Sequence, residues 1–141
     1  MKLKSRLIPL SVAAAALFLA AIHVAQAEDQ VVKIGHTGPL SGANAFAGKD
    51  NENGVRMAVE ELNTKKLVVG GKTLKFELAS EDDQCDPKTG MAVAQKLTDA
   101  GVKFVMGPYC SGVAIPASKI YDSGGAILST VGSNPKVTMG G

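Results

Sequence analysis

Short β-branched runs and helical patterns alternate along the chain from residue 31 onward, and this alternation constrains the fold more than any other feature of the sequence. Four runs have the length and flanking residues of buried strands: Val31–Gly35, Leu74–Ala79, Lys103–Met106 and Ala126–Ser129. Consecutive strands joined by helices favour a parallel arrangement. The sequence therefore predicts an α/β fold, a parallel sheet with helices on both faces.

Each gap between these runs contains a helix signal. In the first gap, apolar residues recur at the i, i+3, i+4, i+7 spacing of an amphipathic helix: Val55, Ala58, Val59 and Leu62. In the second gap, Asp86 is a helix N-cap, Pro87 takes the first helical position and Gly101 ends the helix. In the third gap, Pro116 fits only in a first helical turn, which predicts a helix start between residues 112 and 115.

Loops rich in glycine and other small residues follow the first and third predicted strands. In an open parallel sheet, ligands bind beyond the carboxyl ends of the strands, where the strand order reverses. If the order is 2-1-3-4, the reversal lies between strands one and three. The loops at that point are Thr37–Gly48 and Gly107–Gly112. We therefore expect a binding site between these two loops.

Residues 1–27 have the organisation of a cleavable signal peptide. A basic start is followed by an apolar run over residues 7–22 and by Ala25-Gln26-Ala27, with cleavage expected after Ala27. The alternative is a single membrane anchor, but the run is short for a span of about 20 residues. We expect residues 28–141 to be exported and not inserted in the membrane.

The charge balance gives no electrostatic case for nucleic acid. The whole chain has 15 Lys and Arg, 13 Asp and Glu and a net charge of +2. Without the predicted signal peptide, 12 basic and 13 acidic residues remain, so the net charge becomes −1. A near-neutral domain without a basic cluster is not expected to bind a polyanion.

Cys85 and Cys110 are the two cysteines of the chain. An even number of cysteines in an exported domain favours a disulfide over free thiols. With a 2-1-3 order, however, the strands before the two cysteines lie about 10 Å apart, whereas a disulfide needs Cα atoms within roughly 7 Å. The two loops must therefore curl inward over strand one, and the bond is expected to stiffen the rim of the binding site.

A hydrolase is the main catalytic alternative. Residues 107–112, "GPYCSG", place Cys110 and Ser111 side by side, but they do not form the Gly-x-Ser-x-Gly turn of a hydrolase nucleophile. Either nucleophile needs a base, and His36 is the one histidine outside the predicted signal peptide. A single histidine at a strand end is more often an ordinary rim residue. A secreted hydrolase that uses Ser111 or Cys110 with His36 remains the alternative function.

No cofactor or metal site is expected. The glycines of the first loop lack the spacing of dinucleotide-binding or P-loop motifs, and they are explained by a tight turn alone. The acidic stretch "SEDDQCD" lacks the spacing of a calcium-binding loop and is interpreted as a solvated acidic loop. Its carboxylates are Glu81, Asp82, Asp83 and Asp86.

Ser111 has the position of an anion-binding residue. It lies where a helix is expected to begin after the third strand. Free backbone N–H groups and the positive end of the helix dipole converge at such a start, and a hydroxyl adds a further donor. The simpler interpretation is that Ser111 only caps the helix.

Five segments together resemble a known family, the branched-chain amino acid (Leu/Ile/Val) periplasmic binding proteins of ABC transporters. The segments are, in order, "VVKIGHTGPLSGANAFAG", "NGVRMAVEELN", "EDDQCDPKTGMAVAQKL", "GVKFVMGPYCSG" and "IPASKIYDSGGAILST". The resemblance extends from Val31 to about Pro135. It is carried most specifically by the Asp-Asp-x-Cys-Asp-Pro and Cys-Ser elements.

The resemblance implies a fold, a function and a set of site residues. Family members are two-lobed, each lobe a parallel α/β sandwich with a Rossmann-like topology, and they close on an amino acid without chemistry. This implies a non-enzymatic binding protein in the periplasm that delivers its ligand to a membrane permease. It also implies that Cys85 and Cys110 form the disulfide of the first lobe, that Ser111 binds the ligand carboxylate, and that Gly132 and Asn134 contribute from the turn after strand four.

The chain departs from the family pattern in two respects. A polar residue of a different shape, Asn134, stands where the family often has threonine, and Ala47 stands where an aromatic residue usually covers the ligand side chain, with Phe46 beside it. Family members are also more than twice as long. Residues 28–141 are therefore expected to be an N-terminal ligand-binding lobe, apparently truncated, with an inert truncated lobe as a further alternative.

Overall fold

The computed structural model describes residues 29–139, which form alternating strands and helices. The elements are β1 (Asp29–Gly38), α2 (Ala45–Thr64), β2 (Val68–Val69), β3 (Lys72–Asp82), α3 (Pro87–Asp99), β4 (Phe104–Met106), α4 (Ser111–Ser123), β5 (Ile127–Ser129) and the 3₁₀ helix η2 (Pro135–Val137). The predicted signal peptide lies outside the described residues. Among residues 29–139, no helix has the length and apolar character needed to cross a membrane.

The sheet has the strand order β2-β3-β1-β4-β5, which confirms the order assumed from the sequence for the four main strands. All pairs of these four strands are parallel, and the short β2 joins β3 as an antiparallel edge. The pairing of β1 with β3 runs from Asp29 opposite Thr73 to Gly38 opposite Asp82. The chain therefore reverses direction across the sheet between β1 and β4, as the switch-point argument requires.

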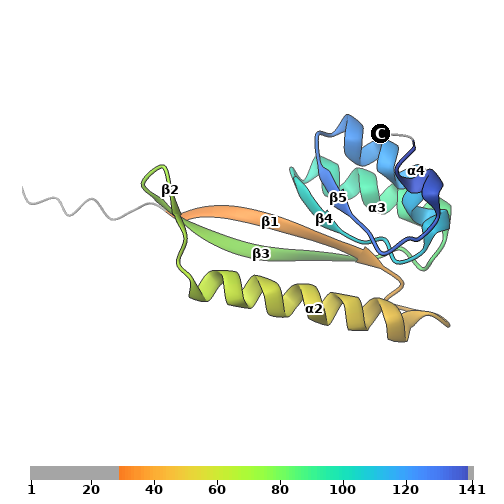
Figure 1. The fold of residues 1–141 in the computed structure, drawn as a ribbon, viewed down its shortest axis with the longest axis horizontal. Helices are drawn as coiled ribbons and strands as arrows, with labels where there is room; N and C mark the ends of the chain where they lie inside the picture. Colours follow the sequence, from red (N-terminus) through yellow and green to blue (C-terminus); the bar gives the residue numbers. More distant parts are fainter. Residues whose placement is uncertain (1–28, 140–141) are drawn as a thin grey trace, which may run out of the picture.

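Two layers of helices cover this sheet (Figure 1). Helix α2 packs along β1 and β3, and α3 and α4 pack against each other on the other face. Successive side chains of β1 point to opposite faces of the sheet, so the strand contacts α2 on one face and α3 on the other. Gly35 faces Leu97 and Val102 on the α3 side, whereas Ile34 lies in the groove beside α2.

The main core lies between the sheet and the pair of helices α3 and α4. Its buried members are Val93, Ala94, Leu97, Val102, Val105, Ala117 and Tyr121. Gly90 allows the two helices to approach closely, since a Cβ there would collide with the side chain of Val113. On the α2 side, β4 and β5 have no covering helix among the described residues, and Phe104 and Ile127 are 43% and 66% exposed.

The start of α4 differs from the prediction. The helix begins at Ser111, one residue before the predicted range, because the Cys110 carbonyl accepts the N–H groups of both Val113 and Ala114 and so closes an earlier turn. Pro116 consequently lies in the second turn, where it lacks the N–H that would bond the Gly112 carbonyl. The prediction that Pro116 lies in the first turn is wrong.

The other helix signals are confirmed. Asp86 caps α3 by accepting the Thr89 N–H, and Pro87 is its first residue. The strands β1 and β3 extend further toward their carboxyl ends than predicted, to Gly38 and Asp82. Because their parallel pairing continues over this extension, both strands reach the candidate site.

Candidate functional site

The loops after β1, β3, β4 and β5 meet at the carboxyl-terminal edge of the sheet. Cys85, in the loop after β3, forms a disulfide with Cys110, in the loop after β4, and their Cα atoms are 5.6 Å apart. Gln84 and Cys85 have φ angles of +53° and +57°, so two successive left-handed residues bend this loop inward. The predicted disulfide and the predicted curl over the end of β1 are thus present together.

A group that we call the rim cluster holds this bend in place; its members are Thr37, Asp83, Cys85 and Cys110. The Asp83 carboxylate accepts the Thr37 hydroxyl at 2.9 Å and the Cys85 backbone N–H at 2.9 Å. Its own N–H donates to the Gly38 carbonyl at 3.0 Å. Asp83 is 0% exposed, and burial raises the pKa of its carboxyl group against the opposing effect of these two donors.

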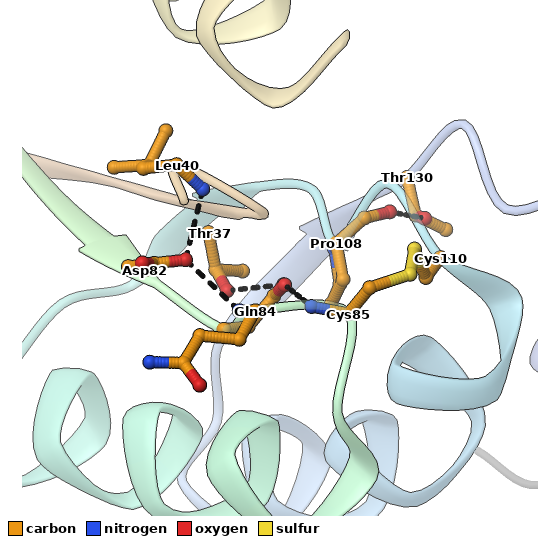
Figure 2. The surroundings of a disulfide bond; sticks show 9 residues. Thr37, Leu40, Asp82, Gln84, Cys85, Pro108, Cys110 and Thr130 are labelled. Atoms are coloured by element: carbon orange, nitrogen blue, oxygen red, sulfur yellow. Dashed lines mark hydrogen bonds between the residues drawn. A yellow bond between two sulfur atoms is a disulfide. The ribbon is translucent and has the colours of Figure 1, made fainter. Parts of the chain in front are cut away.

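The neighbouring Asp82 fastens the loop after β1. Its carboxylate accepts the N–H groups of Leu40 at 2.8 Å and Gln84 at 2.9 Å (Figure 2). It also accepts the Ser41 hydroxyl. Partial burial raises its pKa, but these donors outweigh burial and leave the pKa below its ordinary value.

The stretch "SEDDQCD" is therefore not the solvated acidic loop that the sequence suggested. The carboxylates of Asp82 and Asp83 accept hydrogen bonds from the loops, because the backbone N–H groups at the strand ends need acceptors. Within residues 29–139, no group of three or more His, Cys, Asp or Glu side chains is placed to hold a metal ion.

The three predicted ligand-binding residues lie together. The Ser111 hydroxyl accepts the backbone N–H of Asn134 at 3.3 Å. A Cβ at Gly132 would lie 3.3 Å from both the Cα and the Oγ of Ser111, so the turn after β5 lies directly against the start of α4. Ser111 does not cap the helix, because Cys110 occupies the N-cap position and makes no side-chain capping bond.

The turn after β5 is also bonded to the loop after β4. The Thr130 hydroxyl donates to the Pro108 carbonyl at 2.6 Å and accepts the Gly132 N–H at 2.9 Å. Asn134 caps η2, since its side-chain oxygen accepts the Lys136 N–H at 3.0 Å. Neither η2 nor the role of Thr130 was predicted, because no apolar period or glycine spacing marks them.

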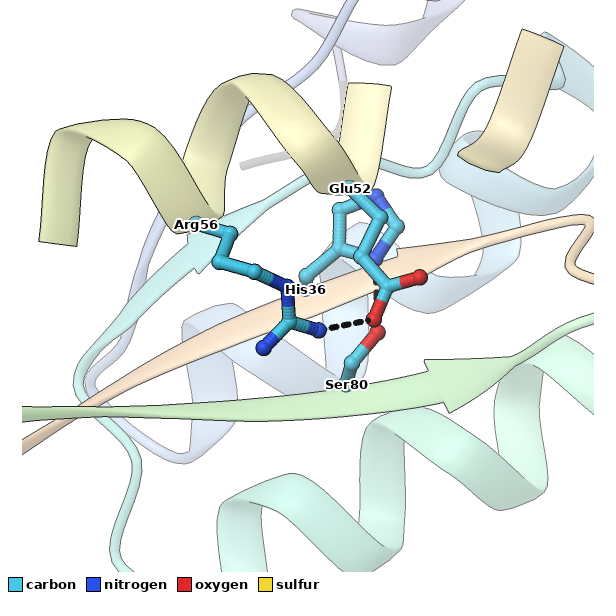
Figure 3. Close-up of polar contacts among 4 residues, drawn as sticks. All are labelled: His36, Glu52, Arg56 and Ser80. Carbon is cyan, nitrogen blue, oxygen red and sulfur yellow. Dashed lines mark hydrogen bonds and ion pairs between the residues drawn. The ribbon is translucent and has the colours of Figure 1, made fainter. Parts of the chain in front are cut away.

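His36 is buried beneath α2 and is not a rim residue, which corrects the sequence interpretation. It is 1% exposed, and its Nδ1 lies 3.0 Å from the Ser80 hydroxyl oxygen. Glu52 and Arg56 of α2 form an ion pair of 2.8 Å above it (Figure 3). We call His36, Ser80, Glu52 and Arg56 the helix cluster. Burial lowers the pKa of His36, while the negative charges of Glu52 and Asp83 raise it.

These positions do not assemble a nucleophile and base. The sulfur of Cys110 is in the disulfide, and the hydroxyl of Ser111 and the ring of His36 bond to different partners. A hollow of about 190 Å³ adjoins the edge on the α2 side, lined in part by His36, Asn51 and Thr130. Ser111 is not among the lining residues of this hollow.

Comparison with known proteins gives a consistent result. Residues 31–139 match the family described as periplasmic binding protein. The leucine-specific-binding protein of Salmonella typhimurium is 37% identical over 124 residues, which cover 87% of this chain and 32% of that protein. An amino acid binding protein of Pseudomonas aeruginosa is 42% identical over 112 residues, covering 78% and 29% of the two chains.

Solved structures agree with these relatives. A branched-chain amino acid transporter substrate binding protein of Streptococcus pneumoniae, in complex with isoleucine, superposes with a TM-score of 0.70 at 26% identity. An ABC transporter substrate-binding protein of Desulfitobacterium hafniense, in complex with Leu, gives 0.64 at 32% identity. Each covers 79% of this chain, and the match covers 32% of each solved chain. The chain spans about a third of the length of the relatives it matches.

Proposed function

Because the chain belongs to the periplasmic binding protein family, we propose that residues 28–141 are the N-terminal ligand-binding lobe of a solute-binding protein for a branched-chain or related amino acid. The protein acts in the periplasm after removal of the signal peptide. It delivers its ligand to the membrane permease of an ABC importer, and it binds without a chemical reaction. The relatives named for leucine or for amino acids support this ligand class.

The grouping of Ser111, Gly132 and Asn134 is the observation that carries the proposal. The first helical N–H groups of α4 that bond to Cys110 are those of Val113 and Ala114, so the amides of Ser111 and Gly112 precede the first bond. Together with the Ser111 hydroxyl and the dipole of a helix of 13 residues, they suit a carboxylate.

The turn after β5 suits the other end of an amino acid. Gly132 brings its backbone against Ser111 without a side chain, and we expect its carbonyl to accept a hydrogen bond from the ammonium group. Asn134 contributes a side-chain amide, whose oxygen already accepts one hydrogen bond from Lys136 and has capacity for a second. A zwitterionic amino acid fits donors and acceptors that lie this close together.

Isothermal titration calorimetry tests the ligand class directly. The mature chain is titrated to millimolar concentrations with leucine, isoleucine and valine, and with glutamate as a control of different side-chain chemistry. We expect heat with at least one of the three branched-chain amino acids. We also expect at least ten-fold weaker binding by Ser111→Ala, because a hydrogen bond to a charged group contributes about 1.5 to 3 kcal/mol. Absence of heat with every amino acid contradicts the proposal.

A further inference from the structure

Asp83 is a buried carboxylate that the proposed ligand chemistry does not use. It is 0% exposed and lies at the end of β3, next to the last residue paired with β1. Both carboxylate oxygens accept hydrogen bonds, one from the Thr37 side chain and the other from the Cys85 backbone. Its backbone is fixed as well, because its N–H donates to Gly38 and its carbonyl accepts the Asp86 N–H at 2.9 Å.

A short series of bonds leads from this carboxylate to the proposed ligand-binding serine. The Cys85 N–H that Asp83 accepts belongs to one of the two left-handed residues of the loop. Cys85 is bonded to Cys110, and Cys110 is the N-cap of α4, directly before Ser111. The position of the first turn of α4 therefore depends on how Cys85 is held.

The Thr37 hydroxyl ties the same carboxylate to the sheet. Thr37 is 1% exposed and belongs to β1, 46 residues before Asp83 in the sequence. One oxygen of Asp83 thus bonds the rigid sheet and the other bonds the loop that carries the disulfide. The Asp83 carboxylate therefore holds the Cys85 loop at a defined position relative to the sheet.

We propose that Asp83 is a positioning residue for the binding site: its carboxylate joins β1 to the Cys85 loop and, through the disulfide, fixes Ser111 for the ligand. The part of this inference that concerns the ligand rests on the proposed function. The part that concerns the loop does not, and it has a consequence measurable without any ligand. The two thiols of the reduced chain should be held close together only while Asp83 accepts the Cys85 N–H.

Three substitutions separate the positioning role from a general contribution to stability. Asp83→Ala removes both acceptors. Asp83→Asn retains both contacts, because its oxygen can accept the Cys85 N–H while its NH₂ group donates to the Thr37 hydroxyl oxygen. Thr37→Val isolates the bond to β1, since it removes one bond of Asp83 but leaves the bond to Cys85.

The experiment is a thiol–disulfide equilibrium of the folded chain against reduced and oxidised glutathione, which gives the effective concentration of the Cys85 and Cys110 thiols. We expect a fall of at least ten-fold for Asp83→Ala, a smaller fall for Thr37→Val, and a value within three-fold of the unsubstituted chain for Asp83→Asn. If Asp83→Ala does not fold, Asp83→Ser, whose short side chain cannot reach both partners, replaces it with the same expected fall. Equal effective concentrations in the folded variants would overturn the proposal.

A leucine titration of the same variants completes the test. We expect Asp83→Ala to bind at least ten-fold more weakly, and Asp83→Asn to recover binding to within three-fold of the unsubstituted chain. If the unsubstituted chain binds no amino acid, the proposed function fails, while the glutathione equilibrium still decides the role of Asp83 in the loop. If leucine binds equally to all variants, the role of Asp83 toward the ligand is refuted and the proposed function stands.

Discussion

Two consecutive residues of β1, His36 and Thr37, are buried members of two polar clusters on opposite faces of the sheet. His36 lies in the helix cluster beneath α2, and Thr37 lies in the rim cluster beside the disulfide. The rim cluster joins loops that are far apart in sequence through a carboxylate and a covalent bond. In the helix cluster, His36 of β1 bonds to Ser80 of β3, and the ion pair is confined to α2.

The difference indicates separate roles for the two clusters. The members of the rim cluster belong to, or hold in place, the loops that position Ser111. Removal of any one member should therefore shift Ser111 at the carboxyl-terminal edge of the sheet. The helix cluster reaches that edge through β1 and β3, and Arg56 has a side chain that is 52% exposed. Its loss should change stability and leave the loop geometry unchanged. The predictions below test this division.

The largest expected effect is that of removing the disulfide. The double substitution of Cys85 and Cys110 by serine releases a loop closed over a sequence separation of 25 residues. Chain entropy predicts a loss of about 3.5 kcal/mol in the free energy of unfolding. Urea unfolding followed by far-UV circular dichroism measures it, with the reduced unsubstituted chain as the control. A loss below about 1 kcal/mol shows that the rim is held without the bond.

Removal of the Thr37 hydroxyl should have the next largest effect. Thr37→Val preserves shape but leaves one oxygen of the buried Asp83 carboxylate without its donor. A hydrogen bond to a buried charged group contributes about 1.5 to 3 kcal/mol, so we expect a loss of that size in unfolding free energy. Thr138→Val is a control of the same chemistry, because the Thr138 hydroxyl bond is exposed. Equal losses of unfolding free energy in the two variants would contradict the claim that the Thr37 bond contributes more because it is buried.

The matching substitution in the helix cluster should have a smaller effect. Ser80→Ala removes the neutral partner of His36, and a hydrogen bond between neutral groups contributes about 1 kcal/mol. Urea unfolding at pH 7.5 measures the loss. The thiol–disulfide equilibrium of this variant should match that of the unsubstituted chain. A change in that equilibrium would show that the two clusters are coupled and would contradict their separate roles.

The smallest expected effect is a pH dependence of opposite sign in the two clusters. Burial lowers the pKa of His36 below 6.5, so the unfolded chain binds the proton more readily. The contribution of His36 to stability is therefore present above pH 6.5 and is lost as the pH falls toward its lowered pKa. Burial raises the pKa of Asp83 above 3.8, so its contribution is present below pH 3.8 and is lost as the pH rises through the raised pKa.

Unfolding free energies measured between pH 7.5 and 5.5 isolate the histidine. The unsubstituted chain should lose stability over this interval, and His36→Gln should lose less because the titrating group is absent. Identical slopes for the two chains would contradict the assignment of this pH dependence to His36.

The sequence predicted the architecture because the fold depends on local patterns. Alternating strand and helix signals fix the element order, and the capping signal at Asp86 and Pro87 fixes the start of α3. The positions of Ser111 and Cys110 after a strand also followed from this order. The disulfide was predictable from two cysteines in a chain that is expected to be exported, since no other cysteine competes.

The polar partners could not be predicted, because they depend on contacts between distant segments. Asp83 bonds to a residue 46 positions away, and His36 to one 44 positions away. Nothing in "SEDDQCD" distinguishes the carboxylate that is buried from those that face solvent. The predicted start of α4 is one residue too late, because the sequence does not show that the Cys110 carbonyl closes an earlier turn.

The central claim is that Ser111 and the start of α4 receive the carboxylate of an amino acid. The most direct measurement is a two-dimensional ¹H–¹⁵N NMR titration of the mature chain with leucine and, in parallel, with leucinamide, which lacks the carboxylate. We expect leucine to shift the amide signals of Ser111, Gly112 and Gly132, and leucinamide to shift them far less at the same concentration. Equal shifts with both compounds, or shifts confined to other parts of the chain, would contradict it.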